Sequence, residues 1–259
     1  MSDSKKTLFT TTVSTDSDRG PVFRGYSVID LFEKGYRMED LAFLILVGRL
    51  PSWEEARIAK AIMMMVVDNG PCVSGALNSI VAARAAVPIS SALCAGLVTI
   101  GPRFGGASTA AAELFDKAVN QGIAPQDYSQ FVLAETGDKR IPGFGHPKFN
   151  LDNPDQRVRF LSKLAHELLG KTAVISFAMQ VEEILTTKKS NLILNIDGMI
   201  GATLLDIGVP EHVIDAFFIW PRALGFLGHI CDQHGEKLLR LDPDMVNFQL
   251  EEVRESPER

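Results

Sequence analysis

The chain has 259 residues and a formal net charge of −6, from 26 Lys and Arg against 32 Asp and Glu. This length allows one large domain or two small ones, and a composition of 46% hydrophobic and 22% charged residues is globular rather than disordered. A non-specific DNA or RNA binder is usually basic, so we expect no nucleic-acid partner.

The sequence contains no recognisable targeting, membrane or metal-binding segment. Residues 1–7 are polar and no signal-peptide core follows them, and the apolar runs are far shorter than the ~20 residues that span a bilayer. Cys72, Cys94 and Cys231 are widely spaced and form no CxxC pair. We therefore expect a cytoplasmic protein with no membrane association and no metal, whose cysteines are buried as small apolar side chains.

The predicted elements are almost all helices. An irregular N-terminal arm with a short hairpin over 8–13 comes first. Apolar residues at helical spacing, separated by Gly, Pro and Asn, then predict a series of helices, one of which begins with the capping-box pair Ser52 and Glu55. The predicted helices cover residues 27–34, 38–48, 53–68, 74–86, 89–100, 108–120, 158–168, 174–185 and 213–229. Residues 192–196 fit a strand by propensity alone, and there is no βαβ alternation, so the fold class is nearly all-α.

Polar residues gather among Gly and Pro in the loops 68–71, 103–106, 143–147 and 195–198, and on the apolar helix 222–229. No loop matches a nucleotide-binding, nucleophile-elbow or zinc-protease motif. The local sequence pattern alone leaves two interpretations open for each candidate residue in these segments.

His146, in a loop bracketed by Gly and Pro, is either catalytic or structural. Asp197 is either a functional carboxylate or a helix N-cap, and Asn69 either meets a ligand or ends a helix. Arg222, on an apolar helix, either pairs with a carboxylate or holds an anionic substrate. Lys188 and Lys189 would by themselves be a solvated loop.

Several motifs, in order along the chain, resemble the citrate synthase superfamily. Residues 31–51 are similar to its opening helices, Gly143-Phe-Gly-His-Pro147 to its GxGH loop, and Asn195-Ile-Asp-Gly198 to its NVD motif. Four further segments resemble citryl-CoA lyases, including the C-terminal module of ATP citrate lyase, and they cover 68–75, 99–107, 185–198 and 224–233. The resemblance extends over nearly the whole chain.

This resemblance implies a citrate synthase-like, all-α protein with its active site between two domains. The large helical domain would comprise 1–103 and 197–259, and the small domain 104–196. The protein would be a homodimer or a higher oligomer, with an acyl-CoA synthetase as a further partner. The reaction would be the retro-Claisen cleavage of (3S)-citryl-CoA to acetyl-CoA and oxaloacetate, with coenzyme A as part of substrate and product and no covalently bound cofactor.

The resemblance also assigns roles to single residues. His146 falls on the histidine that contacts the substrate hydroxyl and the nascent carbonyl, and Asp197 on the carboxylate that exchanges a proton with the acetyl-CoA methyl group. The remaining assignments are substrate binding by Asn69, Arg103, Phe104 and Arg222, and coenzyme A binding by Gly143, Phe144, Gly145, Lys188 and Lys189.

Three positions bear on which reaction and which acyl group to expect. Phe104 stands where citrate synthases carry a histidine that steadies the acetyl-CoA enol, which favours lyase over synthase. Asn69 and Pro147 replace a histidine and an arginine of the lyase pattern, and both changes remove potential positive charge. They leave open a related 3-hydroxyacyl-CoA with fewer carboxylates, as lyase or synthase substrate. A catalytically silent CoA-binding partner subunit is a third interpretation, which the presence of His146 and Asp197 disfavours.

Overall fold

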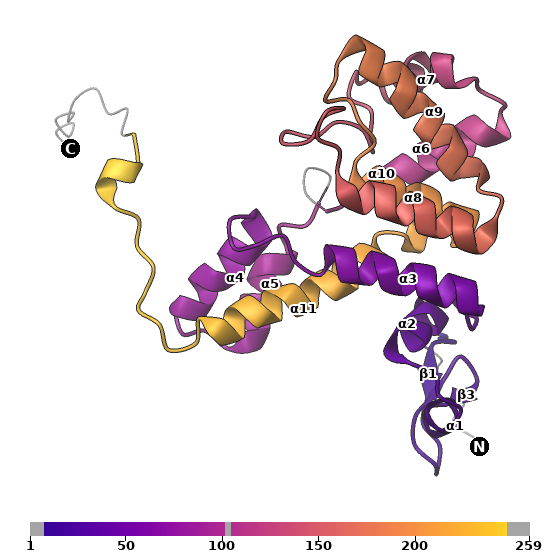
Figure 1. Cartoon of the computed structure of the whole chain (residues 1–259). Helices are drawn as coiled ribbons and strands as arrows, with labels where there is room; N and C mark the ends of the chain where they lie inside the picture. The colour runs from indigo at the N-terminus through magenta and orange to yellow at the C-terminus, as the bar shows by residue number, and fades with distance from the viewer. Residues whose placement is uncertain (1–7, 102–104, 248–259) are drawn as a thin grey trace.

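The computed structural model describes residues 8–101 and 105–247, and it begins with a small antiparallel sheet (Figure 1). Strands β1 (Ser14–Thr15), β2 (Val22–Phe23) and β3 (Tyr26–Ser27) lie in the order β1-β2-β3. The hairpin predicted over 8–13 is therefore wrong in position. The tight turn between β2 and β3 is made by Arg24 and Gly25, whose φ angles of 48° and 88° are both left-handed, as a two-residue hairpin turn requires.

The rest of the chain is helical, which confirms the predicted fold class. The helices are α1 (Val28–Glu33), α2 (Met38–Val47), α3 (Trp53–Val66), α4 (Ser74–Arg84), α5 (Ile89–Leu97), α6 (Ser108–Asn120), α7 (Tyr128–Thr136), α8 (Gln156–Leu169), α9 (Ala173–Lys188), α10 (Ile196–Asp206) and α11 (Ala216–Asp232), with 3₁₀ turns at Pro125–Asp127, Glu211–Val213 and Pro243–Met245. All nine predicted helices are present within a few residues, and the Ser52–Glu55 capping box forms at the start of α3. Helices α7 and α10 are additional.

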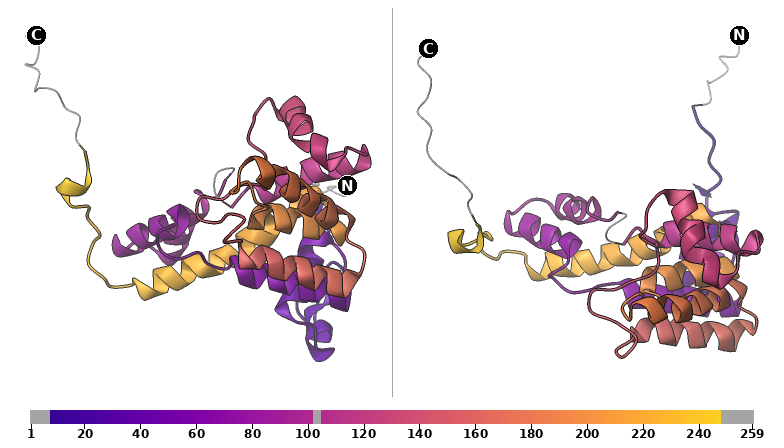
Figure 2. Two further views of the ribbon diagram at one scale, coloured as in Figure 1. Left: turned by 45° about the horizontal axis from the view of Figure 1, so that its top comes forward. Right: turned by 90° about the horizontal axis from the view of Figure 1, so that it is seen from above.

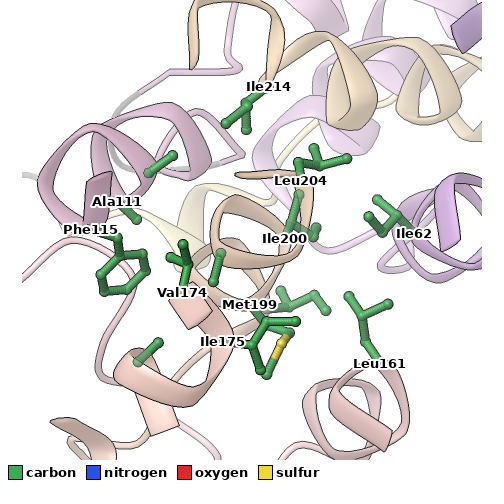
Figure 3. Packing of buried hydrophobic residues seen from close by; sticks show 14 of the residues in the cluster. Ile62, Ala111, Phe115, Leu161, Val174, Ile175, Met199, Ile200, Leu204 and Ile214 are labelled. Carbon is green, nitrogen blue, oxygen red and sulfur yellow. The ribbon is translucent and has the colours of Figure 1, made fainter. Parts of the chain in front are cut away.

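Helix α10 is the centre of one group of helices. It packs against α6, α8 and α9, and Figure 3 shows its residues Met199, Ile200 and Leu204 among side chains from those neighbours. These three residues are fully buried. A helix that is apolar on every side has no amphipathic stripe to reveal it, and for this reason the sequence did not predict α10.

Helix α11 connects this group to the pair α4 and α5. Figures 1 and 2 show α11 running from beside α3 to α4 and α5, and it packs against all three. The stretch Glu211–Asp232 is long and apolar enough to cross a membrane by length and composition only, and 39% of an 18-residue apolar window within it is buried against the rest of the chain. Close packing here depends on glycine, because a Cβ on Gly75 would lie 3.0 Å or less from three ring atoms of Phe226 on α11.

All three cysteines are exposed, so the prediction that they are buried is wrong. Cys94 lies on α5 and Cys231 on α11, and Cys72 lies just before α4. These helices form a thin layer in Figure 2, and a helix in such a layer has an uncovered face.

The division of the chain into a large and a small domain stays a prediction.

Candidate active site

Two segments that are far apart in sequence pair side by side; one contains His146, and the other leads directly into the helix that carries Asp197. The Asn195 N–H donates to the Gly143 carbonyl over 2.9 Å, the Gly145 N–H to the Ile193 carbonyl over 2.8 Å, and the His146 N–H to Asn191 over 3.1 Å. Phe144 and Leu194 form an antiparallel bridge within this pairing. We call residues 143–146 and 191–195 the catalytic ladder. The stretch 192–196, which fits a strand by propensity alone, forms no strand: Leu194 makes a single bridge, and Ile196 already begins α10.

The imidazole of His146 is fixed in one orientation by backbone donors. Its Nδ1 accepts hydrogen bonds from the N–H groups of Lys148 and Phe149, at 3.0 and 3.2 Å. Burial lowers the pKa of His146, and the nearby cations Arg157 and Lys148 lower it further, against the opposing effect of Asp155. The ring is therefore neutral near pH 7, and because Nδ1 is an acceptor, Nε2 carries the proton and is a hydrogen-bond donor.

Asp197 lies in the first turn of α10 and is not its N-cap. The cap is Asn195, whose side chain accepts a hydrogen bond from the Gly198 N–H over 3.0 Å. Burial raises the pKa of Asp197 and Asp215 adds to this, while the Ser108 hydroxyl, 3.3 Å from Oδ1, lowers it, as do Arg157 and Arg222. Burial prevails, so the environment favours the protonated acid.

The ladder and α10 come close together because both carry glycine at the contact. A Cβ on Gly198 would lie 2.5 Å from the Gly143 carbonyl oxygen and 2.8 Å from the Gly143 Cα. Gly143 also has a φ of 84°, which favours glycine. At Gly143, which the resemblance assigns to coenzyme A binding, the close backbone approach in the structure is to Gly198.

The loop after α3 is tied to both α11 and α8. Asp68 accepts from the Gly70 N–H over 2.8 Å and contacts Nε2 of His229 at 3.1 Å. Burial works to raise the pKa of Asp68, but these two bonds outweigh it, so the pKa lies below its usual value. The neighbouring Asn69 is exposed, and its Oδ1 accepts a hydrogen bond from Arg157 over 3.4 Å.

Arg157 is a site residue that the sequence analysis missed. It forms a two-pronged ion pair with Asp155, which is 2% exposed and caps the start of α8. Its guanidinium is near enough to both His146 and Asp197 to lower the pKa of each. A sequence signal for it was available: an acid and a base, Asp155 and Arg157, stand where a helix begins directly after the loop that contains His146.

Arg222 is fully buried on α11 and faces the same region. Its Nε donates to the Val66 carbonyl over 2.7 Å, and its guanidinium lies 4.6 Å from the centre of the Phe218 ring. Burial lowers the pKa of Arg222 to about 10, which still leaves it cationic near pH 7, and Asp68 and Asp197 favour the charged form. Arg222 therefore adds a buried positive charge within electrostatic range of Asp68 and Asp197, and the choice between pairing with a carboxylate and holding an anionic substrate stays open.

The other predicted binding residues differ in position. Phe144 is buried in the core, where its ring packs edge-on against Phe115 and Tyr128. Gly145, with a φ of 91°, belongs to the ladder. Lys188 and Lys189 are exposed at the end of α9, directly before the 191–195 segment. Arg103 and Phe104 lie outside the described residues.

A large hollow of about 1050 Å³ lies elsewhere, between α3, α8 and the loops around α2, and none of the residues above lines it. We place the site at the ladder because the polar groups that can move protons converge there. Within residues 8–101 and 105–247, no group of three His, Cys, Asp or Glu side chains is arranged to hold a metal.

Known proteins resemble this chain in sequence and in structure. Residues 51–242 match the family model described as citrate synthase, C-terminal domain. ATP-citrate synthase of Homo sapiens is 34% identical over 96% of this chain, but the chain spans only 24% of that relative. ATP citrate lyase from Methanosaeta concilii, solved as a mutant with (3S)-citryl-CoA, is 33% identical with a TM-score of 0.86, over 96% of this chain and 42% of the other.

Citryl-CoA lyase from Hydrogenobacter thermophilus is 26% identical with a TM-score of 0.88, over 97% of this chain and 98% of the other. The matches therefore extend over almost the full chain in both sequence and structure. The family model, which matches residues 51–242, and these relatives show that the chain belongs to the citrate synthase family.

Proposed function

We propose that the chain is a citryl-CoA lyase that cleaves (3S)-citryl-CoA to acetyl-CoA and oxaloacetate. The observation that carries the proposal is a pair of complementary groups, His146 on the catalytic ladder and Asp197 on α10, which follows the ladder directly and contacts it at Gly143. His146 presents an N–H donor, and Asp197 is a carboxyl group whose environment favours the protonated form. Relatives named for citryl-CoA or ATP citrate lyase activity share the fold.

The cleavage needs a group at each end of the bond that breaks. The substrate hydroxyl gives its proton to water and becomes the ketone of oxaloacetate, while the bonding electrons pass to the acetyl thioester as an enolate. His146 Nε2–H stabilises the oxygen that becomes the ketone, and Asp197 delivers a proton to the enolate carbon to form the methyl group. The proton that Asp197 gives to the enolate carbon is replaced from water after the reaction, so the cleavage neither gains nor loses a proton overall. Arg157 and Arg222 supply positive charge for the carboxylates of the substrate.

The direction of the reaction follows from Phe104. A phenyl ring cannot hydrogen-bond an enol, so acetyl-CoA is poorly activated for condensation. In cleavage the enolate is the leaving fragment, and Asp197 can protonate it directly. We therefore expect measurable thioester cleavage and negligible formation of citrate from acetyl-CoA and oxaloacetate.

The proposal extends to coenzyme A, to oligomerisation and to location. Lys188 and Lys189 are exposed beside the ladder and would meet the phosphates of coenzyme A. A second copy of the chain would cover the apolar side chains Val98 and Leu224, which are 80% and 65% exposed. We also propose that an acyl-CoA synthetase supplies the thioester, and that the protein is cytoplasmic.

A second candidate is a related 3-hydroxyacyl-CoA with fewer carboxylates. Asn69 cannot become cationic, and its oxygen already accepts from Arg157, which also pairs with Asp155. Pro147 adds no charge beside His146. A site with this reduced positive charge suits a substrate with fewer carboxylates.

A panel of hydroxyacyl-CoA thioesters, with released acetyl-CoA as the readout, tests both candidates. We expect (3S)-citryl-CoA to be cleaved by the unmodified protein and about 10²–10⁴-fold more slowly by Asp197→Asn. The matched control is Asp127→Asn, since Asp127 is an exposed acid outside the site. Cleavage of another thioester in preference to citryl-CoA would favour the second candidate, and no release from any thioester would support a silent partner subunit.

A further inference from the structure

A carboxylate on α9, which the proposed reaction does not use, is bonded to the catalytic ladder. Glu182 is 4% exposed. It forms a two-pronged ion pair with Arg159 of α8, with N···O distances of 2.8 and 3.0 Å. Its Oε1 also accepts a hydrogen bond from the backbone N–H of Leu194 over 3.1 Å.

The place of Leu194 in the ladder gives this bond its importance. In the antiparallel pairing, the N–H groups of Gly145, His146 and Asn195 bond across to the opposite segment. The Leu194 N–H instead bonds to the Glu182 side chain. Leu194 pairs with Phe144, two residues before His146, and precedes Asp197 by three residues. Glu182 therefore holds the ladder at its midpoint, between the two groups that move protons.

The partner of Glu182 extends this support to a third part of the site. Arg159 lies on α8 two residues after Arg157, which faces both His146 and Asp197. A shift of Glu182 would move the ladder relative to the start of α8. The contacts thus connect His146, Asp197 and Arg157 through one carboxylate.

We propose that Glu182 is a positioning residue, which sets the distance between the His146 loop and the start of α10 by holding the Leu194 N–H. This inference rests on the proposed function of that site. A stabilising role alone does not account for the arrangement, because replacing a buried ion pair by apolar side chains is often neutral or favourable for stability. What an apolar pair cannot replace is the acceptor for the buried Leu194 N–H.

Two double variants that differ only at position 182, where one offers an acceptor oxygen and the other does not, make the test. Arg159→Met with Glu182→Leu removes the charges and the acceptor, whereas Arg159→Met with Glu182→Gln removes the charges and keeps an acceptor oxygen. We expect both to fold with similar melting temperatures. With citryl-CoA, the Leu variant should lose about 10–100-fold in kcat, with less than about a threefold change in KM, because the reacting groups are misplaced. The Gln variant should stay within a few-fold of the unmodified protein. Equal kcat values for the two folded variants would overturn the proposal.

A readout without substrate separates this inference from the proposed reaction. The Leu194 amide should exchange with solvent faster in the Leu variant than in the Gln variant, and the NMR signals of the His146 imidazole should shift only in the Leu variant. If the unmodified protein cleaves no thioester but these differences appear, the proposed function fails and the positioning role stands. If exchange and the His146 signals are the same in both variants, the positioning role is refuted whatever the substrate.

Discussion

Replacing Gly198 with alanine tests whether close contact between the ladder and α10 sets the geometry for catalysis. The added Cβ would lie 2.5 Å from the Gly143 carbonyl oxygen, whereas ordinary contacts begin near 3.4 Å. The two backbones must therefore separate by about 0.9 Å. Neither can yield by a rotamer change, because the atoms in contact are mainly backbone.

The stability and the rate should respond differently to this substitution. Alanine within a helix gains about 1 kcal/mol over glycine, while overpacking costs about 1–3 kcal/mol, so the net loss in the free energy of unfolding is at most about 2 kcal/mol. A displacement of about 1 Å between reacting groups can cost about 10²-fold in rate. Gly198→Ala should thus remain folded and lose about 10²-fold in kcat for citryl-CoA cleavage.

The assay measures acetyl-CoA release together with chemical denaturation of each variant. Gly208→Ala is the matched control, because Gly208 has a φ of 72° with no atom within 4 Å of the added Cβ. It should lose about 1–2 kcal/mol of stability through backbone strain and keep its activity. A folded Gly198→Ala variant with a normal kcat would refute the geometric reasoning.

Four further outcomes are expected. His146→Ala should lower kcat by about 10²–10⁴-fold in a folded protein, and a near-normal turnover would remove His146 from the mechanism. Because burial lowers the pKa of His146 below its ordinary 6.5, the neutral ring persists to lower pH, so a loss of cleavage through its protonation should have its midpoint below that value in a pH–rate profile. Asn69→His should raise kcat/KM for citryl-CoA by about 10–100-fold through a cationic hydrogen bond, and no gain would point to a less anionic acyl group. Neutralising Lys188 and Lys189 together should weaken coenzyme A binding in calorimetry at low salt and have less effect at high salt; equal affinity at low salt would show that they only contact solvent.

The sequence predicted the parts of the fold that local periodicity encodes. Amphipathic stripes such as those of α8 and α9 located most helices, and the Gly- and Pro-rich loops located His146 and Asp197. Helix α10 has no polar face to mark it. The contacts of Asp197 with Ser108 and of Asn69 with Arg157 join residues 89 and 88 positions apart, and no local pattern encodes such pairs. For the same reason the bond of Glu182 to the Leu194 N–H could be recognised only in the folded chain.

Helix α10 is both the innermost helix of its group and the element that carries Asp197. Its amides from Met199 to Leu204 are bonded within a buried helix, so they should exchange with solvent only when the whole group of helices unfolds. The Gly145 and His146 amides belong to a short ladder between loops, so they can exchange through local opening. One exchange experiment therefore reports two free energies in the same molecule, that of global unfolding at α10 and that of site opening at the ladder. The difference between the two free energies measures how much more easily the ladder around His146 opens than the helix that carries Asp197 unfolds.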